Sequence, residues 1–105
     1  MAVTDICPCC GRPFDRPELS RLLQVTLDYF GITKSRLRAH RRGDHLGELA
    51  RWAFMTVAYM HTDIPRQIIS AAVRRDETLV SYAVSRMQDN GAVVDALARE
   101  AGFVP

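Results

Sequence analysis

The sequence has little of what marks several common protein classes. No apolar run approaches the roughly 18 residues of a membrane span, and the N-terminus lacks the basic-then-apolar order of a signal peptide. No glycine-rich phosphate loop occurs, and no Ser, His and Asp spacing suggests nucleophilic catalysis. We therefore expect a cytoplasmic protein with no membrane partner, and we do not expect an enzyme.

Cysteine is confined to one short stretch. All three cysteines lie between positions 7 and 10, so they cannot form disulfides that tie distant parts together, and a reducing compartment is expected. Pro8, Gly11, Pro13 and Pro17 interrupt regular structure nearby. We interpret residues 1–17 as an N-terminal arm.

The remaining residues, 18–105, are expected to form one globular domain. The chain has 105 residues, of which 48% are hydrophobic and 25% are charged, close to the globular average. Apolar residues recur at the three-and-four spacing of helices, and no strand pattern is found. The expected helices are 18–30, a short one capped by Thr33 and ending at Gly43, 45–61, 63–73 and 77–89. A last short helix is expected from Val93, Val94, Leu97 and Ala98, and it ends at Gly102.

These helices predict an all-α fold, a small helical bundle. The helix 45–61 is apolar around much of its circumference, which places it in the middle of the bundle. Its residues Trp52, Met55 and Tyr59 are expected in the core or on a dimer surface, so a homodimer stays open. Asp63 is expected to cap helix 63–73, with Pro65 in its first turn, and Asn90-Gly91 to close helix 77–89.

The helices 63–73 and 77–89 have the proportions of a helix-turn-helix, in which the second helix enters the major groove of DNA. Such a helix needs polar side chains on its outward face, and these are supplied by Arg75, Glu77, Thr78, Ser81 and Ser85. An ordinary helical hairpin with a polar surface is the alternative.

A basic segment, residues 34–42, lies two helices earlier. It holds Lys34, Arg36, Arg38, Arg41 and Arg42 without any acid, although the net charge of the chain is only +2. Clustered cations of this kind suit phosphate binding, and a solvated charged face is the alternative.

Together these features resemble a known family. Tyr29-Phe30-Gly31-Ile32, the basic His40-Arg41-Arg42, Ile64-Pro65 and Arg75-Asp76-Glu77-Thr78 follow one another as in the C-terminal DNA-binding domain of the bacterial replication initiator DnaA. The resemblance covers residues 19–89 and implies a helix-turn-helix bundle of the DnaA C-terminal or Trp-repressor-like kind.

The resemblance also implies contacts with double-stranded DNA. An arginine of the basic loop, Arg42 shared with Arg41, would reach the minor groove, and Arg75, Asp76 and Thr78 would contact bases in the major groove. Further contacts are expected from Arg36, Arg38 and Ser81. The function expected is that of a small, nucleoid-associated regulator of transcription or replication. The alternative is a helical protein-interaction module that kept the fold but lost DNA binding, which the acids Asp44, Glu48 and Glu77 favour.

The arm contains a second candidate site. Cys7-Pro8-Cys9-Cys10-Gly11 includes a Cys-x-x-Cys followed by glycine, as in one half of a zinc ribbon, so Cys7 and Cys10 are candidate zinc ligands. The second ligand pair is missing from the sequence. A thiol redox pair and reduced thiols in a flexible arm are the alternatives.

Overall fold

The structure, a computed structural model, describes residues 17–40 and 42–103. These residues form α1 (Pro17–Phe30), α2 (Lys34–Arg38), α3 (His45–His61), α4 (Arg66–Ala72), α5 (Thr78–Arg86), the 3-10 turn η1 (Met87–Asn90) and α6 (Gly91–Glu100). No strand occurs within these two ranges. The expected all-α helical bundle is thus confirmed, and none of the helices described is long and apolar enough to cross a membrane.

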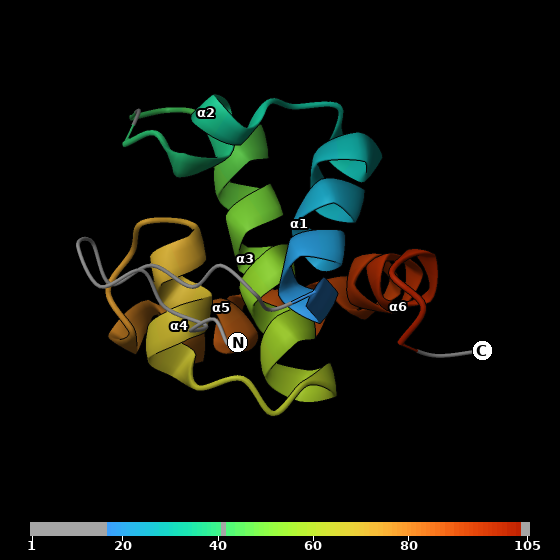
Figure 1. Ribbon diagram of the computed structural model, residues 1–105. Helices are drawn as coiled ribbons and strands as arrows, with labels where there is room; N and C mark the ends of the chain where they lie inside the picture. Colours follow the sequence, from blue (N-terminus) through green and yellow to red (C-terminus); the bar gives the residue numbers. More distant parts are fainter. Residues whose placement is uncertain (1–16, 41, 104–105) are drawn as a thin grey trace.

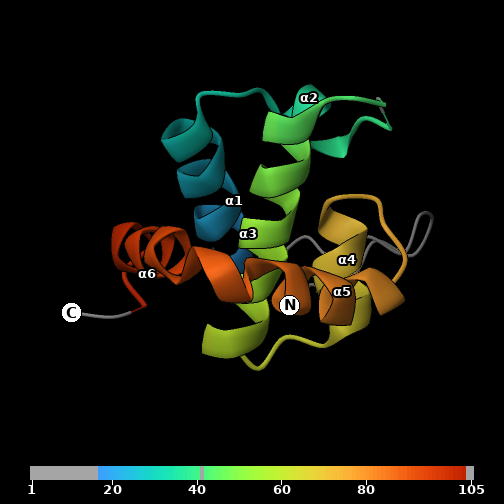
Figure 2. The same cartoon turned by 180° about the vertical axis from the view of Figure 1, so that it is seen from behind.

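Helix α3 runs through the middle of the bundle, as its apolar circumference predicts, and all the other helices contact it (Figure 1). Ala53, Phe54 and Val57 on α3 have no exposed surface. Seen from behind, α5 and α6 run across α3 (Figure 2). Of the α3 residues expected in the core or on a dimer surface, Met55 is buried, Trp52 is half-buried, and Tyr59 is 51% exposed.

The first two helices begin within one residue of the starts that the sequence predicts. Helix α1 buries Leu19, Leu22, Leu23, Thr26 and Leu27, the apolar stripe of the sequence. The Thr33 hydroxyl caps α2 by accepting a hydrogen bond from the Arg36 backbone N–H at 3.1 Å. The predicted end of α2 at Gly43 is wrong, because the helix ends at Arg38 and the chain then turns away.

The boundaries of the last helices also differ from the expectation. Asp63 does not cap α4, which begins at Arg66, because Pro65 has an extended ψ of 148° and is itself the capping residue. The prediction that Asn90-Gly91 closes the helix is wrong. Gly91 does not adopt the left-handed conformation of a helix-ending glycine, because its φ is −56° and it is the first residue of α6. The stretch from 77 to 89 is therefore α5 followed by a 3-10 turn that leads directly into α6.

Candidate nucleic-acid interface

The unit formed by α4, the turn 73–77 and α5 has the layout of a helix-turn-helix. The backbone N–H of Arg75 donates to Ser70 O at 2.9 Å and that of Arg74 to Ala71 O at 3.0 Å, which is the Schellman pattern that closes a helix. Arg74 stands at the left-handed position of this motif with φ 56°, where glycine is usual. The sharp turn is thus built with a cation at its tip, exposed to solvent.

Helix α5 has an apolar inner face and a polar outer one. Val80 and Ala83 are buried, and the predicted contact residues Thr78 and Ser81 are exposed. The Asp76 carboxylate accepts from the Thr78 backbone N–H at 3.0 Å and from its hydroxyl at 3.2 Å. Asp76 therefore orders the first turn of α5 in the manner of an N-cap.

An aromatic side chain shares this outer face. Tyr82 is 49% exposed and meets Trp52 edge to face, with 5.9 Å between ring centroids. The Arg86 guanidinium lies 5.2 Å from the centre of the Trp52 ring and 5.9 Å from that of Tyr82. Sequence reasoning missed Tyr82, although its spacing four residues after Thr78 places both on one helical face.

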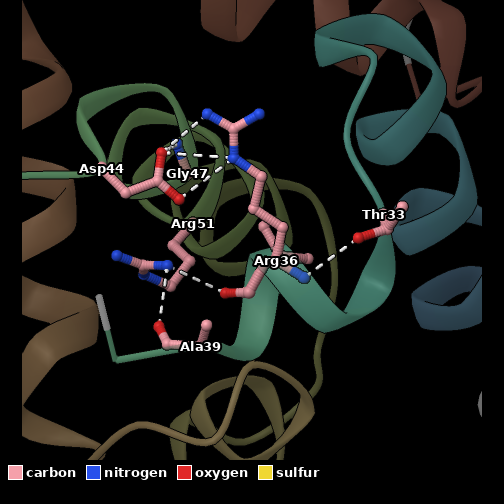
Figure 3. Close-up of polar contacts among 7 residues, drawn as sticks. Thr33, Arg36, Ala39, Asp44, Gly47 and Arg51 are labelled. Atoms are coloured by element: carbon pink, nitrogen blue, oxygen red, sulfur yellow. Dashed lines mark hydrogen bonds and ion pairs between the residues drawn. The ribbon is translucent and has the colours of Figure 1, made fainter.

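In the basic segment, Arg36 forms an internal ion pair. Its Nη2 lies 2.8 Å from Asp44 Oδ1, and its Nε donates to both carboxylate oxygens (Figure 3). The same carboxylate caps α3 by accepting from the Gly47 backbone N–H at 3.1 Å. A Cβ at Gly47 would lie 2.5 Å from Asp44 Oδ2, so glycine leaves room for the carboxylate. The hydrogen bond to Asp44 raises the pKa of Arg36.

Two further arginines hold the end of α2 through its backbone carbonyls. Arg51 Nη1 donates to Leu37 O at 3.0 Å and to Ala39 O at 3.3 Å (Figure 3). Arg75 Nη2 donates to Ala39 O at 2.6 Å, and its Nη1 donates to Arg38 O at 3.3 Å. We call this arrangement, Arg51 and Arg75 on the carbonyls of residues 37–39, the carbonyl clamp.

The clamp explains why α2 stops where it does. The carbonyls at a helix end need partners, and here arginine side chains provide them in place of further helical turns. In the opposite direction, Arg38 Nε donates to Ala72 O at the end of α4, at 2.8 Å. Burial lowers the pKa of Arg51 and of Arg75, and the positive charge of Arg51 lowers that of Arg75 further.

Sequence reasoning missed Arg51, although a signal was present. Arg51 is only 7% exposed and stands in α3 between residues of the apolar pattern, where a charged residue is rarely found without partners. Arg75 was expected to read bases, and in this structure its Nη atoms are directed at carbonyls of the turn and of the basic segment.

The other predicted residues divide into those on this surface and those outside the described ranges. Arg42 is exposed and lines an open hollow together with Arg36, Gly43 and Asp44. Ser81 accepts a hydrogen bond from Arg66 Nη1 at 3.2 Å. Arg41, Cys7 and Cys10 lie outside the described residues, and within those residues no group of three or more His, Cys, Asp or Glu side chains could hold a metal ion.

The structure thus joins the basic segment by hydrogen bonds to the end of α4 and to the turn that precedes α5. In Figure 1 this turn lies on the same side of α3 as α4 and α5. Compared with models of known protein families and with curated proteins, the chain matches none. What this surface binds is therefore inferred from its own geometry and charge.

Proposed function

We propose that the protein binds double-stranded DNA, with the outer face of α5 in the major groove and the basic segment on the neighbouring backbone or minor groove. In this role it would act as a small regulator of transcription or replication. The observation that carries the proposal is the joining of the basic segment to the helix-turn-helix, at the end of α4 and at the turn before α5. The bonds from Arg75 to Ala39 O and from Arg38 to Ala72 O span 36 and 34 positions of sequence.

This joining matters because DNA recognition needs two kinds of contact at a fixed spacing. Cations that neutralise phosphates supply most of the affinity, and side chains at base edges supply the specificity. Thr78 and Ser81 are polar and exposed on a helix whose other face is buried, which supports the proposal that they approach base edges. Arg42 and Arg74, both exposed, supply cations on the adjoining loops.

Two observations favour a second candidate, a helical module that binds another protein. The charges of Arg36 and Arg75 are directed at acceptors within the protein, so fewer cations are left to face a phosphate. Tyr82 and Trp52 present a partly exposed aromatic pair on α5 and α3, and aromatic residues are enriched at protein interfaces. A homodimer through such a face, and zinc on Cys7 and Cys10, also stay predictions.

A titration of fluorescent random-sequence duplex, followed by anisotropy, separates the two candidates. We expect binding whose log affinity falls linearly with log salt between about 50 and 200 mM. Arg42→Glu should weaken binding and flatten the slope. The control Arg99→Glu makes the same charge change at an exposed position of α6, on the other side of α3, and should alter the slope little. Absence of binding by the intact protein at the lower salt would favour the interaction module.

A further inference from the structure

An open hollow between α2 and the helix-turn-helix is lined by cations. Its described lining residues are Lys34, Ser35, Arg38, Ala39 and Arg74, and its volume is about 230 Å³. None of these five residues is acidic, and a hydroxyl stands among the three cations. We call it the cationic hollow.

The position of Arg38 in this hollow is fixed. Its Nε donates to Ala72 O at 2.8 Å, which holds the side chain between α2 and the end of α4. The carbonyl clamp holds the adjoining backbone through Ala39 O. Lys34 and Arg74, from α2 and from the turn, are both exposed at the walls. Lys34, Arg38 and Arg74 thus bring three cationic side chains to the lining of one hollow, and an anion bound there would be attracted by all three.

The backbone conformation of Arg74 is a second observation that points to a ligand in this hollow. It has φ 56°, a left-handed conformation that costs a side-chain-bearing residue free energy, and glycine is the residue usually found at this position of a Schellman motif. Its side chain is exposed, so no packing in the core explains the cost. A need for a positive charge at this position explains why arginine stands here in spite of the cost, since backbone strain concentrates at functional positions.

We propose that the cationic hollow binds a phosphate group, with Lys34, Arg38 and Arg74 as its cations and the Ser35 hydroxyl as a further donor. The phosphate is a phosphodiester of the DNA backbone that flanks the groove entered by α5, an assignment that rests on the proposed function. Arg74 opens the turn that leads into α5, so a phosphate held there sets the position of α5 along the duplex. Free inorganic phosphate offers the same chemistry, and the two arms of the experiment distinguish it from the DNA backbone as the source of the phosphate.

The first arm of the experiment uses inorganic phosphate alone. Phosphate is titrated into the ¹⁵N-labelled intact protein at constant ionic strength, with chloride replaced as phosphate is added. We expect saturable shifts of the backbone amides of residues 34–39 and 74, and their loss in Arg74→Gly. Because glycine suits φ 56°, this variant should fold at least as stably as the parent protein, so misfolding cannot explain the loss.

The second arm uses duplex DNA and matched variants. Arg74→Gly and Lys34→Gln should each weaken binding several-fold and reduce the slope of log affinity against log salt by about 0.9, the value for one lost phosphate contact. Arg99→Gln removes an exposed cation from α6 and should leave the slope unchanged. Equal losses on preferred and scrambled duplexes are expected, since phosphate contacts carry no base information.

The outcomes separate the hollow from the proposed function. Phosphate shifts without any DNA binding would support the hollow and overturn DNA as the source of the phosphate. DNA binding by Arg74→Gly with the same slope of log affinity against log salt as the parent protein would also overturn the assignment of the phosphate to DNA. Absence of phosphate shifts in the intact protein, together with an unchanged slope in the variants, would overturn the hollow itself while DNA binding stands.

Discussion

The two sides of the basic segment differ in the residues that surround their arginines. On one side Arg36 forms a paired contact with Asp44, whose side chain is only 9% exposed and which also caps α3. On the other side Lys34, Arg38 and Arg74 surround the cationic hollow, and no acid is found among its described lining residues. A count of basic residues in a segment therefore does not give the charge that the segment presents to a partner.

The comparison also shows which arginines organise the surface and which are displayed by it. Arg51 and Arg75 hold carbonyls of residues 37–39, and Arg36 bridges to the start of α3. Arg42 and Arg74 are exposed.

Removing the buried member of the clamp should have the largest effect on stability. Arg51→Met keeps an apolar side chain in the core but leaves Leu37 O without its donor and weakens the hold on Ala39 O. We expect a loss of about 2 kcal/mol in the free energy of unfolding, because a buried carbonyl without a partner costs roughly 1–3 kcal/mol and relief of the buried charge offsets part of this. Denaturation in urea, followed by circular dichroism, measures it.

The exposed Arg99→Met on α6 serves as control and should change the stability by less than about 0.5 kcal/mol. A loss in Arg51→Met as small as in this control would mean that the clamp does not anchor the segment.

Arg75→Ala should have a smaller effect on stability and an informative one on DNA binding. Arg75 is half-buried and its acceptors Arg38 O and Ala39 O lie near the surface, so we expect a loss of about 1 kcal/mol. If Arg75 positions the basic segment, as its contacts indicate, affinity should fall alike for duplexes selected from a random pool and for scrambled ones. A loss of about 1–3 kcal/mol on the selected duplexes alone would instead assign base reading to Arg75.

Asp44→Asn should have the smallest effect on stability. It removes the carboxylate that pairs with Arg36, so that this side of the basic segment also loses its acid. Asparagine caps a helix about as well as aspartate, so α3 keeps its start while Arg36 loses its paired carboxylate. DNA affinity at low salt should rise, and the salt slope should steepen by up to about 0.9 if Arg36 gains one phosphate. Asp95→Asn, an equal charge change at an exposed position of α6, is the control. An unchanged slope would mean that Arg36 contacts no DNA phosphate even after its carboxylate partner has been removed.

Much of the fold could be predicted from the sequence because its signals are local. The three-and-four spacing of leucines gave α1 to within a residue, and the all-round apolar pattern gave the position of α3. The end of α2 could not be predicted, because its carbonyls are satisfied by Arg51 and Arg75, which come from distant parts of the chain. The start of α4 was missed because Asp63 is a good capping residue in isolation, while Pro65 adopts an extended ψ and performs that role.

The candidate site was predictable in its parts but not in its assembly. The polar face at Thr78 and Ser81 follows from helical spacing, and both residues are exposed. That Arg36 pairs with Asp44 and that Arg74 joins Lys34 around one hollow depends on how α2 folds back against α3 and α4. Periodicity carries no information about contacts between side chains of different helices and loops.

The carbonyl clamp also has a consequence for the entropy of binding. A loop that is ordered only when it meets its partner loses conformational freedom at that moment, at a cost of roughly 1–2 kcal/mol for each residue of backbone. Here the backbone of residues 37–39 is already held by Arg51 and Arg75 before any partner arrives. The ordering of this stretch therefore belongs to the folding of the protein and not to its binding, which leaves the segment preorganised.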